Sequence, residues 1–238
     1  MVPQGFPLVG ILLVNLGVGV AFLLKETTLR RFDRLNIIFA LWVFTICAYY
    51  STLVVDTLEL DNQALIRLHR VLSLGMFFIP AMYVCFVRAF MNERFRPTTY
   101  AVIFGPGSAL TGALLLDSLG IPLWINTVRL APFGKNVLYH MGMYLVFVGY
   151  FIAYAAYGSV QILRHLARTT VALYEWSWTG LFRQKAFLVP TLGMLVFIAG
   201  FCLDIILAIF YTYYFPITAV TTSFMVLSMA YLLVRVEF

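Results

Sequence analysis

Asp204 is a single acidic residue inside the apolar run 187–209. An ionisable side chain in a membrane span costs roughly 2.5–3.5 kcal/mol on insertion scales, so it is by default a candidate functional residue. A buried carboxylate also needs a cationic or hydrogen-bonding partner. Four candidates stand at the beginnings of other apolar runs: Arg67, His69, Arg70 and His140. Together with Asp204 they form the predicted site.

These five side chains support two kinds of chemistry. Asp204 could pair with Arg67, Arg70 or His140 and lock helices together. Alternatively, the basic groups could line a pocket that receives the polar or anionic head of a ligand, with aromatic and methionine side chains around its tail. The two interpretations overlap, because a lock that a ligand can open is a switch.

Other chemistries have no support in the sequence. There is no HExxH, Walker or GxSxG motif, and no cluster with metal-ligand spacing. The last apolar run, 217–234, has no lysine for a retinal Schiff base, and Cys47, Cys85 and Cys202 all lie in apolar runs. We therefore expect no catalytic residue, no metal and no cofactor.

The elements that position the five residues are membrane helices. The chain of 238 residues is 63% hydrophobic and 11% charged, whereas soluble domains are about 25% charged. Runs of about 20 apolar residues span a bilayer, and their backbone groups must bond internally, as in a helix. The sequence predicts an all-α membrane protein, a single seven-transmembrane-helix bundle over 1–238. Its spans are about 5–24, 35–55, 64–90, 98–116, 137–163, 187–209 and 217–234.

Basic residues predict the orientation of this bundle. Seven spans put alternate loops on opposite sides, and 12 lysines and arginines fall on the side of Lys25, Arg94 and Arg235. The opposite side has four: Arg67, Arg70, Arg129 and Lys135. The positive-inside rule then places the N-terminus outside and the C-terminus in the cytoplasm. The net charge of +6 reflects this orientation, and we expect no nucleic-acid partner.

The same topology places the candidate residues by depth. Asp204 lies about 8 Å below the outer end of its span, at 1.5 Å rise per residue. Arg67 and Arg70 share one helix face and His69 points elsewhere. Asp56 and Asp117 end their spans on the same outer side. We also expect kinks at Pro80 and at Gly105-Pro106-Gly107.

Several short motifs resemble the N-terminal seven-helix sensor region of bacterial histidine kinases and related signalling proteins. The pattern Asn36-Ile37-Ile38-Phe39-Ala40-Leu41-Trp42 resembles the second helix of that family, and Pro80 resembles its mid-helix proline. Arg183-Gln184-Lys185 followed by Gly200 and Asp204 resembles the sixth helix. Ala230-Tyr231 and Arg235 resemble the exit from the seventh helix.

The resemblance implies a multi-pass signalling protein of the bacterial inner membrane, in contact with membrane lipids. It would bind a small amphiphilic or lipid-like ligand in the outer half of the bundle and relay a helix shift to a cytoplasmic or membrane signalling partner. Four residues follow Val234. We therefore expect either an output domain missing after Phe238 or a stand-alone relative. The alternative function is a non-catalytic structural or accessory subunit of a larger membrane complex, and a small transporter is a third, weaker option.

Overall fold

The computed structural model describes residues 5–29, 33–93, 96–131, 134–173, 192–193, 195–200, 202–204 and 217–236. They are mostly helical. The chain divides into two compact units, a first unit from Met1 to Ala156 and a second unit from Tyr157 to Phe238. Each unit is described below by itself.

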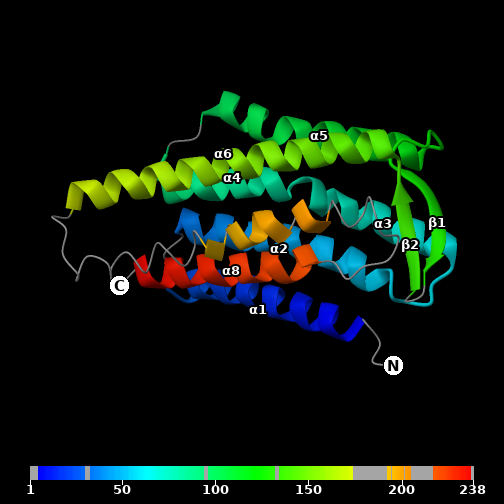
Figure 1. Ribbon diagram of the computed structural model, residues 1–238, viewed down its shortest axis with the longest axis horizontal. Coiled ribbons are helices and arrows are strands. Elements are labelled where there is room, and N and C mark those ends of the chain that lie inside the picture. The colour runs from blue at the N-terminus through cyan, green and yellow to red at the C-terminus, as the bar shows by residue number, and fades with distance from the viewer. Residues whose placement is uncertain are drawn as a thin grey trace. The chain divides into compact units, whose positions relative to one another are not determined.

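The first unit is built from five helices and the beginning of a sixth (Figure 1). Carboxylate caps begin two of them: Asp33 accepts a hydrogen bond from the Leu35 N–H, and Asp61 accepts from Gln63 and Ala64. Such caps satisfy N–H groups that have no partner within the helix. The helices are α1 (Gly5–Leu29), α2 (Arg34–Val55), α3 (Asn62–Phe77), α4 (Ile79–Phe90), α5 (Pro97–Ser118) and the first part of α6 (Met141–Leu173).

Helix α2 lies at the centre of this unit and packs against α1, α3 and α4. Its aromatic side chains form the core with α4: the rings of Trp42 and Phe86 stack with centroids 5.5 Å apart and 12° between their planes. Phe39 is fully buried and lies 4.8 Å from Phe22 of α1. Contact with α3 is close because a Cβ added at Gly75 would lie 2.5 Å from the Ala48 side chain.

The two predicted helix irregularities have different outcomes. Phe78 separates α3 from α4, two residues before Pro80. Proline removes one helical hydrogen bond, so an interruption here agrees with the prediction. Helix α5, in contrast, runs from Pro97 to Ser118 with Pro106 inside it. The Gly-Pro-Gly sequence therefore does not end the helix.

Five stretches of described helix are long and apolar enough to cross a membrane: Pro7–Lys25, Arg34–Val55, Asn62–Phe90, Pro97–Ser118 and Met141–Ile162. They match the first five predicted spans. The described helix in the last two spans is shorter, at Leu195–Asp204 and Ile217–Tyr231. Much of the predicted span 187–209 lies outside the described residues, so the count of seven spans stays a prediction.

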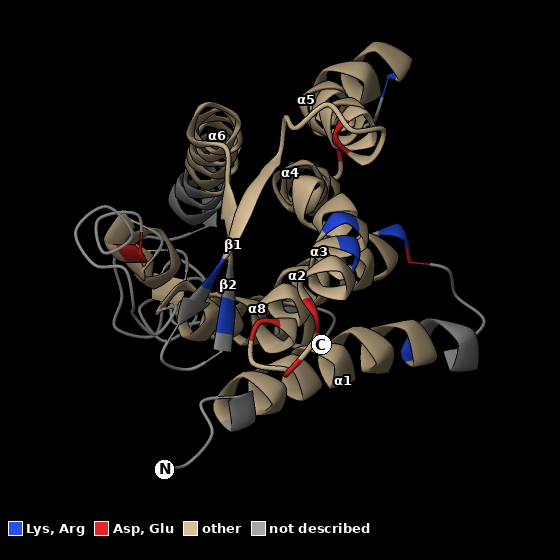
Figure 2. Ribbon diagram, turned by 90° about the vertical axis from the view of Figure 1, so that its right-hand side faces the viewer, with Lys and Arg blue, Asp and Glu red and all other residues tan. Residues whose placement is uncertain are grey.

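The prediction of an all-α fold is wrong for the segment between α5 and α6. Strands β1 (Ile125–Ala131) and β2 (Gly134–Tyr139) form an antiparallel hairpin in which Val128 faces Val137 and Arg129 faces Asn136. Figure 2 faces this hairpin. Its β-branched residues, among them Ile125, Thr127 and Val137, favour strands. The fifth span was therefore predicted to begin too early at 137, because α6 begins at Met141. Its predicted end at 163 agrees with the membrane-length part of α6, Met141–Ile162, and the helix continues beyond it to Leu173.

The second unit contains the remainder of α6, the helical residues 192–193, 195–200 and 202–204, and α8 (Ile217–Val236). We call these described residues between 192 and 204 the Asp204 helix, because the Asp204 side chain makes its contacts with α8.

Candidate functional site at the hairpin

Four of the five predicted residues belong to the first unit. Arg67, His69 and Arg70 lie in α3, and His140 lies between β2 and α6. Asp204 belongs to the second unit. The described contacts of His69, Arg70 and His140 converge on the β1–β2 hairpin, which lies beside the beginning of α3 and the ends of α2 and α5. Arg67 interacts instead through its charge with Asp61.

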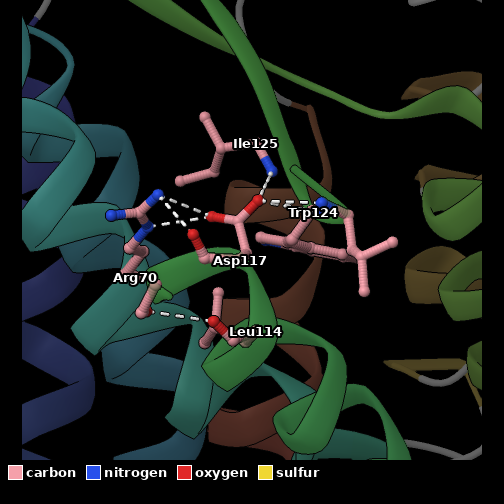
Figure 3. Close-up of polar contacts among 7 residues, drawn as sticks. Arg70, Leu114, Asp117, Trp124 and Ile125 are labelled. Atoms are coloured by element: carbon pink, nitrogen blue, oxygen red, sulfur yellow. Dashed lines mark hydrogen bonds and ion pairs between the residues drawn. The ribbon is translucent and has the colours of Figure 1, made fainter. Parts of the chain in front are cut away.

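Arg70 holds the segment that leads into the hairpin (Figure 3). Its guanidinium binds Asp117, at the end of α5. Nε donates to the carboxylate oxygen Oδ2 at 2.9 Å, and Nη2 lies 2.8 Å from the same oxygen. Nη2 also donates to the main-chain carbonyl of Asp117 at 3.0 Å. The Asp117 side chain is only 1% exposed. A planar guanidinium suits such a multiple contact, and pairing offsets the cost of burying the carboxylate.

The other oxygen of Asp117 binds backbone. Oδ1 accepts hydrogen bonds from the N–H groups of Leu123 at 3.1 Å, Trp124 at 3.0 Å and Ile125 at 3.2 Å. One carboxylate thus joins α3, the end of α5 and the first residue of β1. We call this arrangement the Asp117 anchor.

His69 makes a second connection between helices and hairpin. Its Nε2 lies 2.8 Å from Asp56 Oδ1, just beyond the end of α2, and its Nδ1 lies 3.0 Å from the Tyr139 hydroxyl at the end of β2. The imidazole is buried, and Asp56 is partly exposed. We call these three residues the His69 chain. His69 and Arg70 therefore point to different neighbours, as the helical spacing predicted.

Burial is the main cause of the pKa shifts of Asp56 and Tyr139, the two acids of the His69 chain. Burial raises the pKa of Asp56 above its usual range, and the hydrogen bond and charge of His69 offset part of that rise. Burial also raises the pKa of the Tyr139 phenol. Loss of water disfavours the charged form of both acids. The phenol therefore stays protonated at neutral pH and remains able to bond to His69.

Lys135 of β2 supplements this connection. Its backbone N–H donates to the Asp56 carbonyl at 3.0 Å, and its ammonium donates to the carbonyl of Leu60. Asp61 lies near enough for the charges of Lys135 and Arg67 to help lower its pKa, although the hydrogen bond from the Ala64 N–H is the largest cause. The loop between α2 and α3 thus provides acceptors for β2.

Trp124 fills the space beneath the hairpin. Its side chain is fully buried. The indole packs edge-on against Phe77 of α3, with centroids 4.6 Å apart, and lies 5.0 Å from the ring of Tyr139. His140 contributes its main chain, because its N–H donates to the Trp124 carbonyl at 2.9 Å. Apolar packing and polar anchors therefore hold the same segment.

Asp204 has a different role in the second unit. It is buried, and its Oδ1 accepts from the Ile217 N–H at 2.9 Å while its Oδ2 accepts from the Thr218 N–H at 2.7 Å. These N–H groups open α8, where a negative charge is also favoured by the helix dipole. Arg70 was one of three alternative partners predicted for Asp204, but the carboxylate that Arg70 binds is that of Asp117.

Small residues bring the Asp204 helix close to α8. A Cβ added at Gly193 would lie 2.1 Å from Ser228 Oγ, and one added at Gly200 would lie 2.3 Å from Thr221 Oγ1. The pairs Gly193–Ser228 and Gly200–Thr221 follow one antiparallel register, and the bond from Asp204 to Ile217 continues it. Small residues allow membrane helices to approach closely in this way. The Gly-x-x-x-Asp motif is therefore part of one continuous helix contact.

An apolar groove lies elsewhere in the first unit, beside the break between α3 and α4. Its volume is about 490 Å³, and its lining comes from α2, α3, the break itself, α4 and α5. The lining residues are Leu41, Phe44, Thr45, Gly75, Phe78, Met82 and Phe104. All lie within candidate membrane spans. A groove of this composition can hold an acyl chain.

Sequence reasoning found His69 and Arg70 but missed their partners. Asp56 and Asp117 were predicted to lie at the same side of the helices but without a role, and no role was predicted for Trp124 or Tyr139. The available signal was an acidic residue just after each of two apolar runs. Among the described residues, no group of three or more His, Cys, Asp or Glu side chains could hold a metal ion.

Comparison of the chain with protein-family models, with curated proteins and with solved structures finds no match.

Proposed function

We propose that the protein is a membrane sensor whose responsive element is the β1–β2 hairpin. In this proposal a small or lipid-like ligand enters the outer half of the helices and competes for the groups that hold the hairpin. The resulting helix shift is relayed to a signalling partner in the cytoplasm or membrane. The resemblance to the sensor region of bacterial histidine kinases favours the bacterial inner membrane as the setting, and the basic-residue count favours the outer face for the hairpin.

The Asp117 anchor is the observation that carries this proposal. It brings together one guanidinium and a carboxylate that accepts four hydrogen bonds, with a fifth from Arg70 to the Asp117 main-chain carbonyl, in a chain that is only 11% charged. An anionic head group could replace the carboxylate on Arg70, since guanidinium binds carboxylate and phosphate in the same geometry. Release of Asp117 would then free both the α5 end and the beginning of β1. The apolar groove could receive the tail of the same amphiphile or of a second one.

A structural or accessory subunit is the second candidate function. It is favoured by the extent to which the Asp117 carboxylate is already satisfied by the chain itself, as in a permanent lock. In that case the hairpin would serve to fix helix ends and offer a surface to neighbouring chains.

Native mass spectrometry of the protein released from nanodiscs distinguishes the two functions. The sensor proposal expects a stoichiometric small molecule on the wild type that is lost in Arg70→Ala. Stoichiometric partner chains without a small molecule favour the subunit. Glu93→Gln is the matched control, because it removes the half-exposed partner of Arg88 instead. An adduct that persists equally in Arg70→Ala and Asp204→Asn contradicts the sensor proposal.

A further inference from the structure

We propose that the His69 chain is a proton-binding site, and that one proton shared along it holds the end of the hairpin closed on α2 and α3. The inference deepens the proposed function, on which it rests for its meaning, by naming the proton as a stimulus. The site itself is argued only from contacts within the first unit.

Asp56, His69 and Tyr139 form a continuous path of hydrogen bonds. It runs from solvent at Asp56, through the buried His69 imidazole, to the Tyr139 hydroxyl. The Asp56 side chain is 21% exposed and that of His69 only 2%. Asp56 Oδ1 lies 2.8 Å from His69 Nε2, and His69 Nδ1 lies 3.0 Å from the Tyr139 hydroxyl. A proton can therefore enter at the carboxylate and be held between three elements that are far apart in sequence.

Charge balance gives the closed state its preference for that proton. With Asp56 ionised and His69 neutral, the chain bears one negative charge in a desolvated site. One proton added to this hydrogen-bonded site cancels the charge. Opening the hairpin lets water solvate Asp56 and removes the preference. The closed state therefore takes up a proton that the open state releases.

The other groups around the site do not alter the charge balance between Asp56 and His69. From β2, the Lys135 ammonium is directed to the Leu60 carbonyl, and from α6, Tyr144 stacks on the face of Tyr139 with 5° between the rings. On α3, Ser73 is a neutral neighbour one turn from His69, and Arg70 is neutralised by Asp117. Asp61 and Arg67 face Lys135 from the α2–α3 side with opposite charges. Asp56 is thus the acidic group in contact with His69.

The two attachments of the hairpin differ in their response to pH. Arg70 keeps its charge at every physiological pH, so the Asp117 anchor holds the beginning of β1 throughout. The His69 chain holds the end of β2 and titrates. Because burial raises the pKa of Asp56, closure is favoured at acidic pH. It is lost as the pH rises from the usual carboxyl range through the raised pKa.

Spin labels on the hairpin and on α3 measure this opening directly. The exposed positions are Arg129→Cys and Gln63→Cys, in a Cys202→Ser background where the two remaining cysteines are buried. The protein is placed in phosphatidylcholine nanodiscs, whose lipids carry no net charge, and the label separation is measured by pulsed electron resonance from pH 5 to 9. The open-to-closed ratio should rise with pH by up to about tenfold per unit for one proton.

Three variants test the assignment. Asp56→Asn removes the carboxyl whose pKa burial raises, so its open-to-closed ratio should no longer rise with pH. The double variant His69→Gln with Asp56→Asn keeps no titratable group in the pair, so its ratio should not change with pH. Arg70→Gln is the matched control: it should raise the open fraction at every pH while keeping the wild-type slope. A flat wild-type profile, or a rise with pH that persists in both Asp56→Asn and the double variant, overturns the proton site. The readout needs no ligand or partner, so neither result bears on the mass-spectrometric test of the sensor.

Discussion

At the scale of single residues, the Asp117 carboxylate by itself satisfies polar groups that would otherwise need several hydrogen-bond partners from the loop. One oxygen faces a guanidinium and the other faces three consecutive backbone N–H groups. Unpaired, each of these buried groups would lower stability. Leu123 and Trp124, which precede β1, therefore keep their conformation without a regular secondary structure of their own.

Asp117→Asn should lower the free energy of unfolding by about 2–3 kcal/mol, because breaking a buried ion pair costs about 3–5 kcal/mol and Arg70 is partly exposed. Denaturation of the purified protein in mixed micelles, followed by circular dichroism, measures this loss. Glu93→Gln is the control and should cost less than about 1 kcal/mol, since its ion pair is near the surface. Equal losses in the two variants would show that the Asp117 anchor has no special weight.

Asp61 provides a pH test that is independent of His69. Its pKa lies below the usual value of 3.8, first because of the hydrogen bond from Ala64. A carboxyl whose pKa is lowered by folding stabilises the fold above the unfolded pKa, and this contribution is lost as the pH falls through the folded pKa. Wild type should therefore lose stability relative to Asp61→Asn between pH 5 and 3. Parallel pH profiles of the two proteins in thermal unfolding would contradict the prediction.

At the scale of elements, the hairpin depends on one indole as much as on its polar anchors. Trp124 lies between Phe77, Phe147 and Tyr139. Trp124→Ala should destabilise the first unit by about 3–5 kcal/mol, the usual cost of emptying a large aromatic site. Trp124→Phe should cost clearly less, and hydrogen exchange of residues 125–139 should separate the two variants. Unchanged protection in Trp124→Ala would mean that the anchors alone hold the hairpin.

The contact between the Asp204 helix and α8 depends on a missing side chain. Gly200→Ala would place Cβ within 2.3 Å of Thr221, and such overpacking typically costs about 1–3 kcal/mol. Thr221→Ala should recover part of the loss. Gly149→Ala in α6 is the matched control, because nothing lies within 4 Å of an added Cβ there. Thermal unfolding of the three variants and the double variant measures the coupling, and equal effects of both glycine changes would exclude a close contact.

At the scale of the whole chain, the prediction that remains open is the topology. Arg129→Cys on the hairpin should react with a membrane-impermeant maleimide added to the outside of intact spheroplasts, in a Cys202→Ser background. Arg96→Cys, just before α5, should react only after permeabilisation. The reverse pattern would invert the orientation derived from the basic residues.

The sequence predicted the position of most long helices well because a run of about 20 apolar residues marks each of them. The predicted spans 35–55 and 98–116 differ by at most two residues at either end from α2 and α5. The hairpin was not predicted, because the alternation of apolar and polar residues in its strands is weak. The helices on either side of it have much stronger hydropathy. Partners were missed for another reason: Arg70 and Asp117 are 47 residues apart, and His69 and Tyr139 are 70 apart. No local pattern reports such pairs.

The separation of Arg70 from Asp117 also has a consequence in time. At about 5–20 residues per second, a ribosome needs roughly 2–10 s to add the residues that lie between them. During that interval Arg70 of α3 lacks its ion-pair partner, because Asp117 has not yet been synthesised. The hydrogen bond between His69 and Tyr139 can form only later still, after Tyr139 has been synthesised. The ion pair that joins α3 to the end of α5 can therefore form only after α5 has been synthesised, and the contact of His69 with β2 only after that.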